Sequence, residues 1–326
     1  MNEIRGAAFW NVYAHDRLLD LLPDWEPKRQ ALIDQQKNRK AGLAGEKRVL
    51  EVLRSIDLPQ GSVVFWDVSL PLFPGVWIQF DILILSCFGL LILEVKQIAG
   101  RLRFVSNPAA LQKIENNLVT LTMGCPAAQF GDQRAGLETW LRMRSFHIPV
   151  HGSVVFTTNP IIEDIPRGLP IISLRELRMY IRDYLRGNPA FTIDELKRLI
   201  HAFESSRSRF LPYPLCSNYN IDHSKVPLGP RCNCGQQLVK DTEKVWVCNR
   251  CNLRSKVSYR KVLLDWFLLR SKTITVSQCA ALFGIHRQSA WRILNQLPLE
   301  KHGNGRQTFY EIDYEDFDGL ALLLNG

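Results

Sequence analysis

Residues 78–97 read IQFDILILSCFGLLILEVKQ, and the expected architecture of the chain follows from this stretch. Two strongly apolar runs, ILIL and LLIL, flank the short segment SCFG, which suits a hairpin turn. Charged side chains stand only at the outer ends of these runs: Asp81 before the first, Glu94 and Lys96 after the second. Such side chains are rarely buried unless they are paired or bind a metal ion. The stretch therefore predicts a buried hairpin with a group of charges at one end.

The predicted hairpin would bring two carboxylates and an amine together. Asp81 and Glu94 would approach each other across the strand pair. Side chains alternate along a strand, so Glu94 and Lys96 would share one face while Val95 points to the other. Two carboxylates and the Val95 carbonyl oxygen suit Mg²⁺ or Mn²⁺, which activates water and stabilises charge on a phosphodiester. Lys96 could orient the attacking hydroxide or stabilise the transition state, and Glu46 on a preceding helix could add a carboxylate.

A simpler interpretation is an ordinary ion pair between Glu94 and Lys96 at a strand edge, with Asp81 in a turn. A single acid-x-lysine match favours that interpretation. The combination found here favours the metal site, because a helical glutamate, an apolar strand with Asp81, a turn and a second apolar strand ending in Glu-Val-Lys occur in order.

The rest of the first 210 residues favours a sheet with helices around it. Periodic apolar residues predict helices, and runs rich in β-branched and aromatic residues predict strands. Thr192 with Glu195, and Ser173 with Glu176, have the spacing of helix capping boxes. The expected strands are 62–70, 77–85, 90–95 and 150–157, with a further hairpin near 100–105, and the expected helices include 43–56, 111–123 and 127–143.

Several short motifs lie in the order typical of one family. They are Ala44-Gly45-Glu46 on a predicted helix, Ile78-Gln79-Phe80-Asp81, Phe88-Gly89 followed by Leu93-Glu94-Val95-Lys96-Gln97, Pro126 with Gln129, and the strand 151–157 followed by Asn159-Pro160. Together they resemble the nuclease-related domain (NERD), a branch of the PD-(D/E)XK nuclease superfamily. The resemblance covers about residues 41–160, although Cys125 stands where the family usually has asparagine.

The resemblance implies a fold, a chemistry and a set of residues. The implied fold is an α/β PD-(D/E)XK-like mixed sheet flanked by helices. The implied chemistry is metal-dependent nuclease activity, with metal and catalytic roles for Glu46, Asp81, Glu94 and Lys96 and with Gln97 nearby. Apart from Gln97, these are the residues that the strand and helix patterns already favour.

A second metal site is predicted by a cluster of cysteines. Four of the eight cysteines crowd into twenty residues and are Cys232, Cys234, Cys248 and Cys251. Such clustering in a reducing compartment favours a metal over disulfides, and the spacing indicates a zinc ribbon in which four thiolates hold a structural Zn²⁺. The first pair is Cys-x-Cys, shorter than the usual Cys-x-x-Cys, so Cys216 or His223 could replace one ligand.

Residues 257–326 predict a winged-helix-like helix-turn-helix domain. A helix at 259–269 is followed by ITVSQCAALFGI and HRQSAWRIL, which indicate a helix, a glycine-containing turn and a second helix with Trp291 in the core. The segment 303–306, GNGR, could form the primed turn of a wing hairpin. The residues expected to contact DNA are Arg287, Gln288, Ser289 and Arg292 in the major groove, and Arg306 in the wing. The alternative is a small helical domain for protein contacts.

Composition agrees with a nucleic-acid partner without requiring one. The 326 residues carry a formal net charge of +9, and 46% are hydrophobic, which is ample for several domains. The N-terminus has no signal-peptide pattern, and the most apolar stretch, 82–93, is about half the ~20 residues of a membrane-spanning helix. We therefore expect a cytoplasmic protein with no membrane segment. The expected domains are 1–210 (nuclease-related), 211–256 (linker and zinc ribbon) and 257–326.

These patterns together predict a Mg²⁺-dependent deoxyribonuclease directed to DNA by its C-terminal modules. A second hypothesis is a DNA-binding regulator, or a repair or defence factor, whose nuclease-like fold has lost activity. RNA is a third possibility for the substrate, since zinc ribbons also occur in RNA-binding proteins. The sequence leaves the oligomeric state open.

Overall fold

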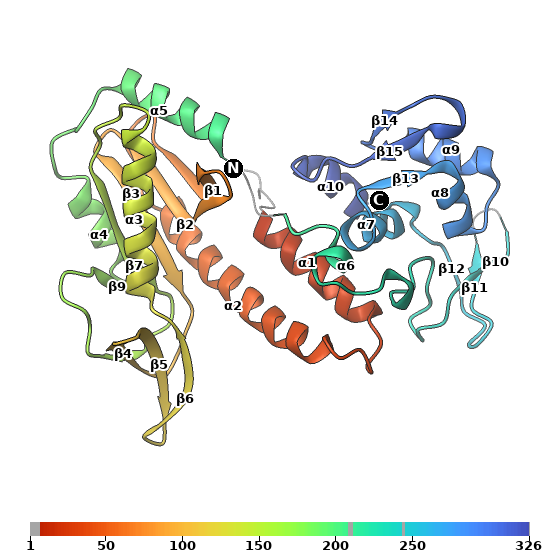
Figure 1. The fold of residues 1–326 in the computed structure, drawn as a ribbon, viewed down its shortest axis with the longest axis horizontal. Helices are drawn as coiled ribbons and strands as arrows, with labels where there is room; N and C mark the ends of the chain where they lie inside the picture. The colour runs from red at the N-terminus through yellow and green to blue at the C-terminus, as the bar shows by residue number, and fades with distance from the viewer. Residues whose placement is uncertain (1–6, 208–210, 243–244, 326) are drawn as a thin grey trace. The chain divides into compact units, whose positions relative to one another are not determined.

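The computed structural model describes residues 7–207, 211–242 and 245–325, and the chain divides into two compact units (Figure 1). We call Asn38–Phe210 the sheet unit, and Met1–Lys37 together with Leu211–Gly326 the terminal unit. The first boundary falls within helix α2 (Arg29–Arg54), so this helix supplies residues to both units. Within the described ranges, every helix is too short or too polar to cross a membrane.

A five-stranded mixed sheet forms the centre of the sheet unit. Its strands are β1 (Val63–Phe73), β2 (Val76–Ser86), β3 (Gly89–Lys96), β7 (Val150–Phe156) and β9 (Ile171–Ser173), in the order β1-β2-β3-β7-β9. β1, β2 and β3 pair antiparallel, whereas β3, β7 and β9 pair parallel. β3 and β7 are buried along most of their length. Their nearly continuous apolar sequences are typical of strands that are covered on both faces.

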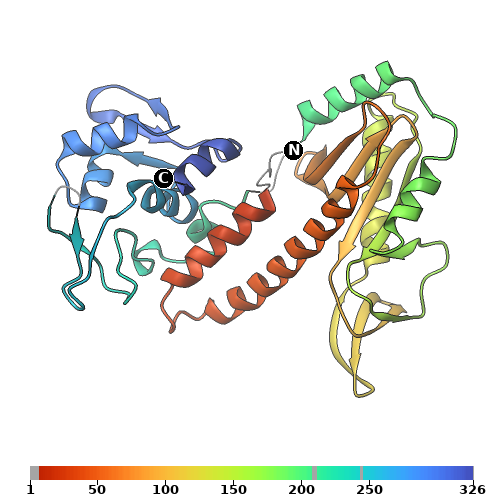
Figure 2. The same cartoon turned by 180° about the vertical axis from the view of Figure 1, so that it is seen from behind.

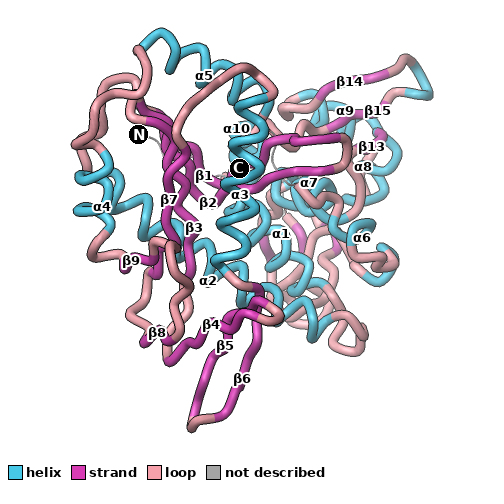
Figure 3. The backbone as a smooth tube through the Cα atoms, turned by 60° about the vertical axis from the view of Figure 1, so that its left-hand side comes forward, coloured by secondary structure: helices cyan, strands magenta, loops and turns pink. Residues whose placement is uncertain are grey.

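Helices cover both faces of this sheet (Figure 3). On one face, α2 and α4 (Leu177–Tyr184) pack on β3, so that Val49 and Leu177 share a core with Leu91. On the other face, α3 (Pro126–Arg142) and α5 (Ile193–Ser206) share a core with Ile92. α3 lies in front of the sheet in Figure 1, and Figure 2 shows the reverse side. The predicted mixed sheet flanked by helices is confirmed, as is the capping box of Thr192 with Glu195.

A second, four-stranded sheet corrects one prediction. Its strands are β4 (Arg101–Ser106), β5 (Ala109–Glu115), β6 (Leu118–Gly124) and β8 (Ile161–Glu163), in the order β6-β5-β4-β8. The helix expected over 111–123 is wrong, since β5 and β6 form a hairpin there. Asn116 and Asn117 have φ values of 51° and 63°, as the centre of a two-residue primed turn requires. Leu118 and Leu121 are exposed, so their spacing does not mark a buried helical face.

The terminal unit joins the two ends of the chain in one core. Helix α1 (Ala7–Leu21) packs on α7 (Tyr259–Leu269), and Trp10 and Leu18 are buried with residues of α7. Arg17 donates two hydrogen bonds to the buried Asp265, from Nε at 3.0 Å and from Nη2 at 2.7 Å. The short helices α6 (Leu215–Asn218) and η1 (His223–Lys225) belong to the same unit. The predicted division into 1–210, 211–256 and 257–326 stays a prediction, because packing units need not coincide with independently folding domains.

The last seventy residues have the element order of a winged-helix domain. After α7 come β13 (Thr273–Thr275), α8 (Val276–Phe283), α9 (Arg287–Asn295), β14 (Glu300–His302), η2 (Gly305–Gln307), β15 (Phe309–Glu311) and α10 (Phe317–Leu324). The three strands form a sheet in the order β13-β15-β14. Gly284 ends α8 in the left-handed conformation, with φ 59°, and so makes the turn into α9. The wing loop is longer than the expected primed turn, because η2 lies between its two strands.

Candidate functional site

The candidate site lies where β2 parts from β3. The antiparallel pairing of these strands ends with Ile82 opposite Leu93, and the preceding part of β2 runs beside β1. At this point Oδ2 of Asp81 accepts a hydrogen bond from the backbone N–H of Val95 at 2.8 Å. The Asp81 carboxylate thus satisfies a backbone N–H that a paired strand would otherwise satisfy. The same hydrogen bond holds Asp81 at the opening between the strands.

The β1–β2 ribbon is irregular beside this opening. Phe65 and Val68 of β1 lie three residues apart and both enter the same core, so the usual alternation of side chains shifts between them. Phe80 and Leu83 of β2 show the same shift. Asp67 stands at this irregularity with φ 47°, a conformation that aspartate tolerates better than most residues. The part of β2 that precedes Ile82 pairs with β1 and not with β3.

Glu94 is the most enclosed acid of the group. Its side chain has no exposed surface, and its Oε1 lies 2.6 Å from Lys96 Nζ. Its Oε2 accepts a hydrogen bond from Gln133 Nε2 at 2.6 Å, and the same nitrogen donates to the Gln79 carbonyl oxygen at 3.0 Å. Lys96, whose side chain is 21% exposed, also donates to Gln129 Oε1 at 3.0 Å. Both Glu94 oxygens are therefore engaged by neighbours, and Lys96 lies between Glu94 and α3.

Glu46 reaches the site from α2. It accepts a hydrogen bond from Trp66 Nε1 at 2.6 Å. The neighbouring Gly45 lets the helix approach the end of β3 closely, since a Cβ there would lie 3.1 Å from Gln97 Cβ. Gln97 itself accepts a hydrogen bond from Thr157 Oγ1 at 3.3 Å. Gln97 thus lies at the contact of α2 with the ends of β3 and β7.

The acids oppose one another's ionisation. Burial raises the pKa of Glu46 to about 7; the Trp66 N–H lowers it, and the charges of Asp67 and Glu94 raise it further. Burial, then the charges of Glu94 and Glu46, raises the pKa of Asp81 well above its ordinary value. Lys96 is the cation that offsets this negative charge at both groups. Additional positive charge at this cluster would therefore favour the ionised form of its acids.

The donor set fits a hard divalent cation. Carboxylate oxygens are the ligands that Mg²⁺ and Mn²⁺ prefer, and the mutual repulsion of the acids would be relieved by such an ion. A further observation agrees: the buried Oε1 of Gln133 has no hydrogen-bond partner among the described residues. The acids are not gathered as tightly as a closed cage, since the cysteines described below are the one group of three or more His, Cys, Asp or Glu ligands found within 4.8 Å in the described ranges.

The structure thus brings Glu46, Asp81, Glu94 and Lys96 to one place. Val95 lies between Glu94 and Lys96 in β3, gives its N–H to Asp81 of β2 and buries its side chain on the α2 face. Sequence reasoning missed Trp66, Asp67 and Gln133. Gln133 had one usable signal, because it follows Gln129 by four residues and therefore lies on the same side of α3.

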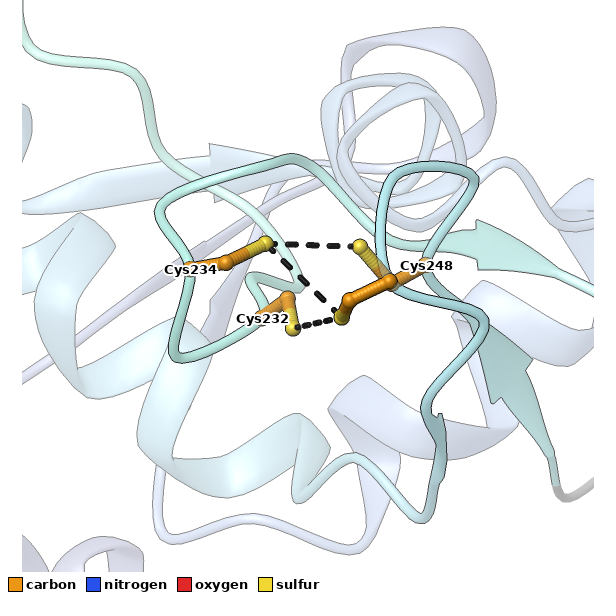
Figure 4. A group of neighbouring side chains, drawn as sticks. Cys232, Cys234 and Cys248 are labelled. Atoms are coloured by element: carbon orange, nitrogen blue, oxygen red, sulfur yellow. Dashed lines mark hydrogen bonds between the residues drawn. The ribbon is translucent and has the colours of Figure 1, made fainter.

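The four predicted cysteines converge in the terminal unit (Figure 4). Their sulfur atoms all lie within 4.8 Å of one another, so they could hold a metal ion. The sulfurs of Cys232 and Cys251 are 3.4 Å apart, and those of Cys234 and Cys248 are 3.5 Å apart. The three short strands β10 (Val239–Lys240), β11 (Trp246–Val247) and β12 (Arg254–Ser255) pair in that order, as in a ribbon. Cys216 and His223 are not members of the group.

Backbone N–H groups around these cysteines stabilise the negatively charged thiolate form. The N–H groups of Cys251 and Arg250 hydrogen-bond to Cys248 and lower the pKa of its thiol to about 6. At Cys232 the N–H of Cys234 acts in the same direction, but burial and hydrogen bonds with the other thiols outweigh it and raise the pKa to about 12. Protons are thus shared unequally within the group, as expected of sulfurs crowded at metal-site distances.

Helix α9 presents most of the predicted DNA-contacting residues to solvent. Arg287, Gln288, Ser289 and Arg292 are exposed. The prediction that Trp291 is a core residue is wrong: it is 48% exposed. Ala290 and Leu294, one helical turn apart, fill the core position instead. The side chain of Arg306 lies outside the described part of the structure.

Comparison with known proteins agrees with the geometry of the sheet unit. Residues 41–157 match the family model of the nuclease-related domain (NERD). The matched segment contains all four charged residues of the candidate site. No curated protein and no solved structure matches the chain. The cysteine group and the winged-helix elements lie outside the matched residues.

Proposed function

We propose that the sheet unit is a metal-dependent nuclease that hydrolyses phosphodiester bonds of DNA. One observation carries the proposal: Asp81, Glu94 and Lys96 meet where β2 parts from β3, with Glu46 beside them. The match of residues 41–157 to the nuclease-related domain supports it. The proposal gives these side chains a joint role that a plain strand-edge ion pair does not require.

In this proposal Asp81 and Glu94 hold Mg²⁺ or Mn²⁺, with the Val95 carbonyl oxygen as a further ligand and Glu46 as a neighbouring carboxylate. The ion, when bound, lowers the pKa of a water molecule and stabilises charge on the scissile phosphate. Lys96 leaves Glu94 and turns its ammonium group toward the phosphodiester, where it stabilises the negative charge of the transition state. Gln97 keeps the end of β3 against α2.

The terminal unit, in the same proposal, directs the nuclease to DNA. Zn²⁺ bound by Cys232, Cys234, Cys248 and Cys251 stabilises the ribbon and takes no part in the chemistry. Residues of α9 read the major groove and the wing follows the backbone, through Arg287, Gln288, Ser289, Arg292 and Arg306. We place the protein in the cytoplasm, because clustered free thiols suit a reducing compartment.

The test is a cleavage assay on supercoiled plasmid, linear duplex, single-stranded DNA and RNA, with Mg²⁺, Mn²⁺ or EDTA. We expect DNA cleavage with either metal ion and none with EDTA. Glu94→Gln and Lys96→Ala should abolish cleavage while DNA binding persists. Glu138→Gln, which alters an exposed acid of α3 paired with Arg134, is the matched control and should cleave normally. Cleavage that survives in Glu94→Gln protein refutes the assignment.

The second candidate is a DNA-binding protein without catalytic activity. The enclosure of Glu94 favours it, because both carboxylate oxygens are engaged by Lys96 and Gln133. The same assay separates the candidates. Specific DNA binding by the wild-type protein, with no cleavage of any substrate under any metal condition, supports the inactive alternative and rejects the nuclease.

A further inference from the structure

Gln133 spans the gap that opens between β2 and β3. Its Nε2 donates to Glu94 Oε2 on β3 at 2.6 Å and to the Gln79 carbonyl oxygen on β2 at 3.0 Å. Beyond the last paired residues, Ile82 and Leu93, the two strands have no ladder bonds to each other in the described structure. Besides the hydrogen bond from Val95 to Asp81, one amide group on α3 therefore ties the two strands together at the level of the candidate site.

The side chains around Gln133 belong to the apolar core, but Gln133 itself carries a polar amide. Its neighbours on the same side of α3, Phe130, Leu137 and Trp140, are buried apolar side chains. Gln133 is only 5% exposed, and its Oε1 has no hydrogen-bond partner among the described residues. Burying an amide with one unsatisfied atom costs free energy, so a buried group of this kind calls for an explanation such as a functional role. The atom that lacks a partner belongs to a side chain already bonded to Glu94.

We propose that Gln133 is a positioning residue for the metal-dependent reaction: it fixes one oxygen of Glu94 so that the other is presented to the divalent ion. The inference rests on the proposed function. With Oε2 held by Gln133, Oε1 is the oxygen that Lys96 now contacts and that becomes available when Lys96 moves. The free Oε1 of Gln133 is an acceptor for a water molecule of the ion's hydration shell, because Mg²⁺ and Mn²⁺ keep several waters.

The deciding variant is Gln133→Met, which keeps the length of the side chain and removes both hydrogen-bonding groups. Residues that orient a metal ligand typically contribute about 10- to 100-fold in metal affinity or activity. We expect Mn²⁺ binding to the full-length protein without DNA, measured by calorimetry, to weaken about tenfold. In cleavage, kcat should fall about 10- to 100-fold while KM for DNA changes less than about twofold, since Gln133 orients an acid and does not touch DNA.

Two controls separate positioning from loss of stability. Arg134→Met places the same side chain at the next residue of α3, where Arg134 is exposed and paired with Glu138, and should leave Mn²⁺ binding and cleavage unchanged. Gln133→Asn keeps the amide but shortens its reach, so it should give an intermediate loss and covers the case in which Gln133→Met does not fold. Thermal unfolding of each variant identifies the folded fraction.

A double-mutant cycle asks whether Gln133 acts through Glu94. In a Glu94→Gln background, Gln133→Met should have no further effect on Mn²⁺ binding, because the group that it positions is gone. Additive effects, or unchanged Mn²⁺ affinity and kcat in folded Gln133→Met protein, overturn the inference while the nuclease proposal stands. If the wild type binds Mn²⁺ in a Gln133-dependent manner but cleaves nothing, the nuclease proposal fails and the positioning role of Gln133 stands.

Discussion

At the scale of single residues, Glu46 provides a measurable consequence of the crowded acids. Its pKa is raised to about 7 in the folded chain, mainly by burial, so the folded state favours the protonated form. The associated stability is present below the unfolded-state pKa near 4.5 and is lost as pH rises through about 7. In EDTA, the free energy of unfolding of the sheet unit should therefore decrease over this window, by on the order of 2 kcal/mol.

Glu46→Gln should flatten that dependence, since the amide has no charge to acquire. Urea unfolding at several pH values between about 4.5 and 8 measures it. Glu51→Gln, on an exposed position of the same helix, is the matched control and should keep the wild-type slope. A slope unchanged in Glu46→Gln protein would show that another group carries the pH dependence.

The residues of the candidate site differ in how far the sequence could predict them. Asp81, Glu94 and Lys96 could be singled out because each interrupts or ends an apolar strand, where an isolated charge is costly. For Gln133 the only signal was its spacing of four residues from Gln129, and a glutamine in an amphipathic helix is usually a surface residue. Asp67 was missed because its unusual backbone conformation, and its effect on the pKa of Glu46, depend on the pairing of β1 with β2 and not on the local sequence.

At the scale of elements, α9 carries a prediction on DNA affinity. Arg287→Ala and Arg292→Ala should each weaken binding, and each should reduce the slope of log K against log salt by about one if the side chain neutralises a phosphate. Titrations of labelled duplex at several salt concentrations measure both quantities. Arg260→Ala, an exposed arginine of α7 outside the helix-turn-helix, should behave as wild type. Equal losses in all three variants would assign the effect to net charge instead of to α9.

Elements were predictable where burial and periodicity agree. β3 and β7 were expected from apolar runs that are indeed buried. The prediction of a helix over 111–123 was wrong because some of its apolar residues, such as Leu118, are exposed in a hairpin. Their spacing therefore does not indicate the buried face of a helix. Trp291 failed for the opposite reason: a large aromatic residue was assigned to the core, although the smaller Ala290 fits the close packing there.

At the scale of the whole molecule, the two units should respond differently to loss of zinc. We expect one Zn²⁺ per chain by elemental analysis, and a strong chelator should destabilise the terminal unit, whose core includes Cys232 and Cys248. The sheet unit should keep its unfolding transition, because its cores contain none of the four clustered cysteines. Calorimetry with and without chelator resolves the two transitions.

Cys248→Ser should reproduce the effect of the chelator, and Cys87→Ser, in the turn between β2 and β3, should leave the zinc content at the wild-type value. A wild-type protein free of zinc that nevertheless unfolds with both transitions intact contradicts the assignment.

The packing of α1 on α7 could not be predicted from the sequence. The apolar residues of α1 give no sign of the partner, more than two hundred residues away, against which they pack.

The packing of α1 on α7 also bears on how the chain acquires its structure during translation. α1 leaves the ribosome well before α7, because the segment 38–210 is made between the two helices that pack through Trp10 and Leu18. Until α7 emerges, the part of α1 that packs on α7 therefore stays uncovered, while the mixed sheet can already assemble. Nascent chains stalled before residue 259 should hold α1 accessible to protease, and those released beyond α10 should protect it.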